Sequence, residues 1–271
     1  MEATGTYYLA LAYYLHEQGA QVAVLNPLVV KRFIQMHLGK GKSDRKDAQW
    51  LLRFGQQQEV KCWQPEEAVL VECRQLEQVR EQLLKQQTML RNSLEALQQH
   101  PVVSKLVLKQ LRHSLRLLDQ QVQALEAELL GLLEQRYATE MTLLCSIPGI
   151  GRKTAGLLLL FAGGFARLDN YRQLIAMAGL SPREHSSGTS IRGRARITKM
   201  GGALIRSKLF MCSFAAKKRN RACQALYDRL VAKGKNGKVA LIAVCNKLLK
   251  QAFAIVKSGV PYQAEFTSSL A

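Results

Sequence analysis

The sequence lacks the features that mark several common classes of protein. Its six cysteines include no Cys-x-x-Cys pair, which argues against a structural zinc site and a disulfide scaffold and favours buried thiols in a cytoplasmic protein. No run of 18 or more apolar residues occurs, so we expect no transmembrane helix and no membrane partner. The first residues lack the positive charge that opens a signal peptide, and we therefore expect the protein in the cytoplasm.

Acidic residues are scarce in the second half of the chain. Residues 141–271 carry 22 Lys and Arg against 4 Asp and Glu, which leaves 17 basic and 16 acidic residues for 1–140. Nearly all of the net charge of +19 therefore lies on one half. A neutral half joined to a strongly basic half predicts a surface for a polyanion, with nucleic acid ahead of an anionic membrane.

The chain divides into three zones, which we expect to be domains. Residues 1–62 read as a small α/β part, with a helix from Tyr7 to Glu17, a short strand over 22–25 and helices after Pro27 and Ser43. One strand cannot form a sheet, so this zone looks incomplete. Residues 63–138 show leucines at spacings of three, four and seven, from Leu76 and Val79 onward, broken at Pro101. The pattern predicts an antiparallel coiled-coil hairpin, or else two helices of an ordinary bundle.

Residues 139–271 form the basic zone, in which we expect only helices. Its Pro-Gly-Ile-Gly segment at 148–151 leads into a helix that carries Arg152 and Lys153 in the first turn. This pattern resembles a helix-hairpin-helix element, where Gly149 and Gly151 would let backbone N–H groups approach a phosphate. The alternative is a tight turn between helices that binds no ligand.

A cluster of hydroxyl side chains beside glycine lies farther along this zone. The candidates for a nucleophile are Ser186, Ser187, Thr189 and Ser190. Four cations follow that would neutralise a phosphate, namely Arg192, Arg194, Arg196 and Lys199. The alternative is a solvated basic loop without chemistry.

Several short segments, taken together, resemble one family. They are Glu2-Ala3-Thr4-Gly5, Val24-Leu25-Asn26-Pro27, Lys42-Ser43-Asp44-Arg45-Lys46-Asp47-Ala48, Ile147-Pro148-Gly149-Ile150-Gly151, Ala178-Gly179-Leu180-Ser181-Pro182-Arg183, Ser186-Ser187-Gly188, Ile197-Thr198-Lys199-Met200-Gly201 and Lys233-Gly234-Lys235. In their order and spacing the chain resembles the DEDD-type transposases of the insertion-sequence-110 group, which are related to pilin-gene invertases. The resemblance spans most of the chain.

The resemblance implies a RuvC-like, RNase H-type domain in which four acidic residues bind Mg²⁺. Three of these positions match here, at Glu2, Asp44 and Asp47. Independently of the family, Asp44 and Asp47 lie three residues apart on the expected helix and share one face, although helix capping and a salt bridge with Lys46 or Arg45 are simpler roles. The family begins with strands that carry a first catalytic Asp, and the sequence starts after them, so we expect a truncated fold.

The resemblance also implies a catalytic serine, best matched by Ser187, that attacks DNA to form a 5′-phosphoserine in a composite site with the acidic residues. It further implies a structured guide RNA beside the DNA, and the coiled coil predicts a homo-oligomer. The expected function is a transposase or site-specific recombinase. A non-catalytic nucleic-acid-binding remnant is the alternative, and a Holliday-junction nuclease a weaker one, because a two-metal nuclease needs no serine.

Overall fold

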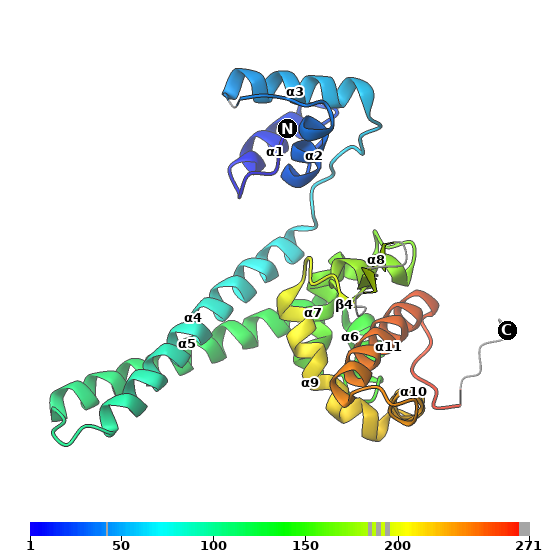
Figure 1. Cartoon of the computed structure of the whole chain (residues 1–271). Helices are drawn as coiled ribbons and strands as arrows, with labels where there is room; N and C mark the ends of the chain where they lie inside the picture. Colours follow the sequence, from blue (N-terminus) through cyan, green and yellow to red (C-terminus); the bar gives the residue numbers. More distant parts are fainter. Residues whose placement is uncertain (42, 184–185, 188–190, 193–195, 266–271) are drawn as a thin grey trace. The chain divides into compact units, whose positions relative to one another are not determined.

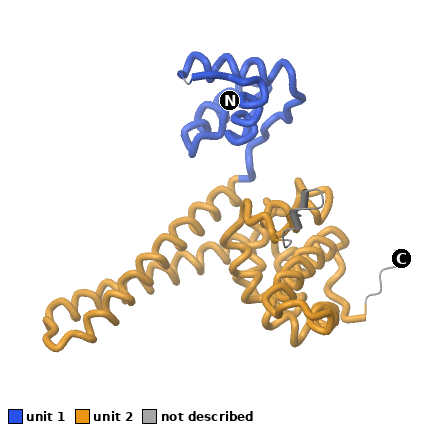
Figure 2. Tube along the Cα trace, in the orientation of Figure 1, with its two compact units in different colours: residues 1–67 blue, residues 68–271 orange. Residues whose placement is uncertain are grey.

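The protein is mainly helical and consists of two compact units, Met1–Glu67 and Ala68–Ala271 (Figures 1 and 2). The computed structural model describes all residues except 42, 184–185, 188–190, 193–195 and 266–271. Each unit is described by itself below.

The first unit contains three helices, α1 (Tyr8–Glu17), α2 (Pro27–Met36) and α3 (Asp44–Gln57). The side chain of Asn26 accepts a hydrogen bond from the Leu28 N–H at the start of α2, and the hydroxyl of Ser43 accepts one from the Lys46 N–H at the start of α3. Pro27 takes the first helical position, where its missing N–H costs nothing. These residues allowed the starts of α2 and α3 to be predicted from the sequence.

The strand expected over 22–25 is reduced to a single parallel bridge between Glu2 and Leu25. The Ala3 N–H donates to the Leu25 carbonyl and the Leu25 N–H donates to the Met1 carbonyl, both at 2.9 Å. Two segments this short, paired only with each other, do not form a stable β-ladder. The core of this unit combines aliphatic side chains, such as Val22 and Val30, with the rings of Phe33 and Phe54, which meet edge to face at 5.0 Å.

The second unit begins with two long helices, α4 (Ala68–Gln98) and α5 (Lys105–Arg136), which run side by side (Figure 1). The α5 face toward α4 is apolar, with Leu118, Val122, Leu129 and Leu133 buried. The α4 face is mixed, because it buries Glu77 and Gln87 beside Leu70 and Cys73.

One leucine-pattern assignment on α4 is wrong. Val79 was expected in the apolar seam, yet it is 43% exposed. The buried positions of α4 run through Cys73, Glu77 and Gln87, and Val79 lies off that stripe. Gln87 lies in the seam because its amide donates to the Asp119 carboxylate of α5 at 2.5 Å.

The remaining helices build the basic part of the second unit. They are α6 (Ala138–Cys145), α7 (Arg152–Ala162), α8 (Tyr171–Met177), α9 (Ala203–Arg219), α10 (Arg221–Ala232) and α11 (Gly237–Ser258), with the short 3-10 helix η1 (Gly163–Phe165) after α7. By length and composition α11 would be able to cross a membrane. It is the core helix here, since its apolar side chains, including the fully buried Leu248 and Leu249, pack in the main hydrophobic cluster.

The expectation of a purely helical C-terminal part is wrong at residues 182–197. Strand β1 (Pro182–Arg183) pairs antiparallel with β4 (Arg196–Ile197), and β2 (Ser186–Ser187) pairs antiparallel with β3 (Ile191–Arg192). The second pair lies within the loop closed by the first, so the described backbone here is a short ribbon. Cysteine burial was also overestimated, because Cys62 is exposed.

Candidate nucleic-acid cleavage and binding sites

Two of the three predicted carboxylates share a cavity in the first unit. Glu2 and Asp47 both line a hollow of about 440 Å³, together with Lys31 and Trp50. Glu2 is placed by its bridge to Leu25, and Asp47 by the capped first turn of α3. The parallel bridge therefore brings residues from distant points of the sequence to one place.

Asp44 does not join them among the described residues that line this cavity. It lies in the same helical turn as Asp47 but is exposed, whereas Asp47 is half-buried. Neither takes part in an ion pair with another described residue, so the salt-bridge role with Lys46 or Arg45 is not seen; Lys46 instead donates to the Lys40 carbonyl at 3.1 Å.

The donor set fits Mg²⁺ in part. Within the described ranges no three His, Cys, Asp or Glu side chains gather closely enough to hold a metal ion. Mg²⁺ is commonly held by one or two carboxylates, with waters and substrate phosphates completing its octahedron. Glu2 and Asp47 suit that incomplete kind of site, and the Lys31 ammonium at the same cavity would favour an anionic substrate.

The hydroxyl-rich segment of the second unit is only partly described. Ser187 lies in β2 with its Cα opposite Ile191, and Ser186 lies opposite Arg192. Thr189, Ser190 and Arg194 lie outside the described residues. The ribbon therefore brings the backbone of Ser186 opposite Arg192, a predicted phosphate-binding residue, and leaves the predicted nucleophile Ser187 one position from that pair.

The base of the ribbon is closed by contacts that sequence reasoning missed. Arg206 of α9 donates from one guanidinium nitrogen to the carbonyls of Ala178 and Gly201, both at 2.9 Å. These carbonyls precede and follow the ribbon, so Arg206 ties its two ends together. Only its basic character was visible beforehand, because the contact that closes the ribbon reaches the Ala178 carbonyl, 28 residues away.

The two predicted cations near the base of the ribbon are placed differently. Arg196 is exposed on β4, paired with Arg183 of β1. Lys199 is exposed, adopts a left-handed backbone with φ 56°, and its N–H donates to the Gly179 carbonyl at 3.0 Å. Both side chains therefore remain available to a polyanion.

The Pro-Gly-Ile-Gly turn joins α6 to α7 and packs on α9. Gly149 has φ +106°, and a Cβ there would lie 2.8 Å from the Cβ of Ala216. Gly151 caps α7 and faces open space. The first glycine is therefore required by packing, while the second leaves the start of α7 accessible.

The cations of the α7 first turn already have carboxylate partners. Arg152 pairs with Glu134 of α5 at 2.5 Å, and Lys153 pairs with Glu126 of α5 at 2.6 Å. The hydrogen bond from Arg152 lowers the pKa of the Glu134 carboxyl and raises the pKa of the guanidinium. Arg152 and Lys153 remain 63% and 75% exposed, so a phosphate would compete with α5 for them.

Comparison with known proteins places these sites in a family. A model described as the transposase IS116/IS110/IS902 family matches residues 141–228, and a model for the DEDD transposase of IS110 elements matches residues 1–100. The pilin gene-inverting proteins of Moraxella bovis and Moraxella lacunata are each 32% identical over 266 residues, which covers 97% of this chain and 80% of the relative. The chain belongs to the IS110 family of transposases. An IS110 protein of Streptomyces coelicolor is 31% identical over 165 residues, covering 61% of this chain and 40% of the relative.

The two family matches cover every predicted site residue. Glu2, Asp44 and Asp47 fall within the DEDD match, while Gly149, Ser187 and the residues between Arg152 and Lys199 fall within the second. Family membership makes DNA the substrate class and recombination the class of reaction.

Proposed function

We propose that this transposase cuts and rejoins DNA with Ser187 as nucleophile, assisted by a divalent-metal site at Glu2 and Asp47. The match to two DNA-inverting proteins over nearly the whole chain carries the proposal. The shared cavity of the two carboxylates supports it, as does the β2–β3 pairing, in which the Cα of Ser186, the neighbour of Ser187, lies opposite that of Arg192.

The reaction is a transesterification at phosphorus. The Ser187 oxygen forms a bond to the phosphorus while the bond to the 3′-oxygen breaks, and the serine proton leaves to a base as the 3′-oxygen gains one. A 3′-hydroxyl from another strand then attacks the 5′-phosphoserine, which re-forms a DNA linkage and frees the serine. No net hydrolysis occurs, so the bond energy is retained for rejoining.

The residues around the ribbon would supply electrostatic stabilisation. The phosphorane transition state concentrates negative charge, which Arg192, Arg196 and Lys199 are suited to offset, with Arg194 as a further candidate. Arg206 acts as a positioning residue, because it holds both ends of the ribbon.

The metal would be Mg²⁺, held by Glu2 and Asp47, with Asp44 as a third ligand if the first turn of α3 adjusts. Bound there, it would supply charge neutralisation at a DNA phosphate. The two carboxylates give the cavity negative charge. The capped first turn of α3 holds Asp47 in place, and the parallel bridge holds Glu2 in place.

We further propose a structured guide RNA as a partner, a homo-oligomer assembled through α4 and α5, and a cytoplasmic, nucleoid-associated location. The charge of +18 on residues 141–271 is larger than contact with a short stretch of DNA requires, and it suits the binding of several nucleic-acid strands at once. Exposed apolar side chains on the hairpin, such as Met89 and Leu106 at 62% and 65%, support self-association.

A covalent-adduct assay tests the nucleophile. The chain is incubated with Mg²⁺, labelled duplex DNA from the flanks of its gene, and RNA transcribed from the same flanks. The expected product is a protein–DNA adduct on a denaturing gel, mapped by peptide analysis to Ser187. Ser187→Ala is expected to remove the adduct while DNA binding persists, and Ser186→Ala to keep it.

Two results would contradict the proposal in different ways. An adduct in the Ser187→Ala protein would assign the nucleophile to another hydroxyl. DNA binding without any adduct in the parent chain would favour a non-catalytic binding protein of the same lineage.

A further inference from the structure

Helices α10 and α11 border a basic groove that the proposed chemistry does not use. One pocket of about 250 Å³ and a second of about 420 Å³ share Ala222, Lys247 and Lys250 as lining residues. They are therefore two parts of one groove, which we call the α10–α11 groove. Arg229 of α10 lines its wider part.

The charge of this groove is of one sign. Residues 221–258 contain eight Lys and Arg and a single acid, Asp228. No Asp or Glu is among the described residues that line either pocket. Unlike Arg152 and Lys153, the two shared lysines have no carboxylate partner among the described side chains. Lys250 instead lies over the Tyr171 ring at 4.7 Å, which leaves its charge for an anion.

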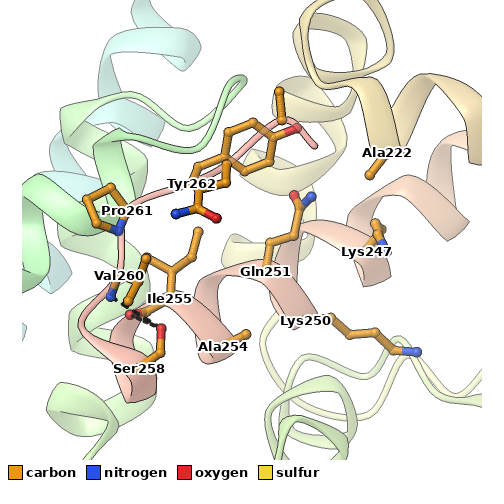
Figure 3. A pocket seen from close by; sticks show the side chains of 12 residues that line it. Ala222, Lys247, Lys250, Gln251, Ala254, Ile255, Ser258, Val260, Pro261 and Tyr262 are labelled. Atoms are coloured by element: carbon orange, nitrogen blue, oxygen red, sulfur yellow. Dashed lines mark hydrogen bonds between the residues drawn. The ribbon is translucent and has the colours of Figure 1, made fainter. Parts of the chain in front are cut away.

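The narrower pocket is built differently from a plain phosphate site. Its walls include Ile255, Val260, Pro261 and the ring of Tyr262. In Figure 3, Pro261 and Tyr262 come from the segment after α11, whereas Lys247 and Gln251 come from α11 itself, so the two segments enclose the pocket. Apolar and aromatic walls beside lysines suit a nucleobase attached to its phosphate.

The aromatic wall is held in place at both ends. The Tyr262 hydroxyl donates to the Asn220 side chain at 3.1 Å, and the Tyr262 N–H donates to the Ser146 hydroxyl at 2.9 Å. Asn220 in turn exchanges amide hydrogen bonds with Gln251. A ring fixed in this way is a preformed surface, so a base loses less entropy on packing against it than on a mobile side chain.

The wider part offers one further polar group. The side-chain carbonyl of Asn246 is buried and has no hydrogen-bond partner among the described residues, while its amide donates to the Leu180 carbonyl at 3.2 Å. Asn246 lines the groove beside Lys247. Because this carbonyl is shielded from solvent, it would accept a hydrogen bond from a nucleotide N–H or O–H only if the Asn246 side chain turned toward the groove.

We infer that the α10–α11 groove binds an unpaired nucleotide of a single strand, with its base in the Tyr262 pocket and its flanking phosphates on Lys247, Lys250 and Arg229. This site rests on the proposed function, because the strand would belong to the nucleic acid on which the transposase acts. A duplex fits less well, since its bases are stacked and only its backbone would reach the pocket.

The test compares a labelled single-stranded oligodeoxynucleotide with an oligomer of abasic deoxyribose phosphates of equal length and charge. The full chain is expected to bind the base-bearing strand roughly tenfold more tightly, the lower range for one stacked base. Ala254→Trp fills the pocket without changing charge and is expected to remove this preference. Val239→Trp, on an exposed position of α11 outside the groove, is the control and should keep it.

A second pair of variants tests the phosphate contacts. Lys247→Gln with Lys250→Gln should lower affinity for both oligomers and reduce the salt slope by about 1.4, at about 0.7 per single-strand contact. Lys233→Gln with Lys235→Gln removes equal charge outside the groove and should change the slope less. An RNA strand of the same sequence shows whether ribose is preferred.

The outcomes separate this site from the function on which it rests. Equal affinity of the parent for both oligomers, or a preference that survives Ala254→Trp, overturns the groove assignment alone. Failure of the parent to bind any nucleic acid overturns the groove and the proposed function together. Circular dichroism of each variant confirms that the fold is kept.

Discussion

Substitution of the two glycines in the Pro-Gly-Ile-Gly turn is expected to separate a structural residue from an accessible one. Gly149 has φ +106°, and an added Cβ would meet the Cβ of Ala216 at 2.8 Å and its backbone nitrogen at 3.0 Å. The left-handed backbone costs an alanine roughly 1–2 kcal/mol, and overpacking adds roughly 1–3 kcal/mol. Gly149→Ala is therefore expected to destabilise the second unit by about 2–5 kcal/mol.

Gly151→Ala is the matched control in the same turn. Its φ of −96° suits any residue, and nothing lies within 4 Å of the added Cβ. We expect a change below about 1 kcal/mol, because alanine is only a poorer N-cap. In a domain of this size each kcal/mol moves the melting temperature by about 2–4 °C.

Thermal unfolding followed by circular dichroism is the measurement. Gly149→Ala should melt on the order of 10 °C below Gly151→Ala, given the conversion for a domain of 150–250 residues. If phosphate approaches the start of α7, Gly151→Ala should also weaken nucleic-acid binding without loss of stability. Equal melting temperatures for the two variants would show that Gly149 is not packed against α9 as described.

Two further predictions concern the hairpin. Leu118→Asp places a charge in the buried seam and should lower the free energy of unfolding by about 3 kcal/mol or more, seen as lost helicity by circular dichroism. Leu117→Asp, at a position 46% exposed, should keep the helicity. If the hairpin self-associates, this second variant should reduce the mass measured by light scattering. Unchanged helicity in Leu118→Asp would place the seam elsewhere. Glu134→Gln removes the carboxylate whose pKa is lowered by the hydrogen bond from Arg152. The freed guanidinium should raise the salt slope of duplex binding by up to about 0.9. A slope that does not rise would mean that Arg152 serves only to join α7 to α5.

Local signals in the sequence were sufficient for most of the helices. Asn26 with Pro27, Ser43 and Pro101 each act on the neighbouring backbone, so they marked helix ends without knowledge of distant contacts. Val79 shows the limit of periodicity, because the seam of α4 is defined by what α5 presents to it. Gln87 is buried there for the same reason, as it meets Asp119 of α5, whereas Glu77 is buried with its ion-pair partner Arg80 on α4 itself.

The sequence by itself determined the basic character of residues 141–271 and the helix order, since these depend on composition and short spacings, and the family resemblance supplied the candidate carboxylates. Only the tertiary structure decided that Glu2 shares a cavity with Asp47 and that Arg152 is paired with Glu134. It also decided that Arg206 closes the ribbon. Each of these contacts joins residues far apart in the chain, and pairing over that distance depends on how the helices pack rather than on any local preference.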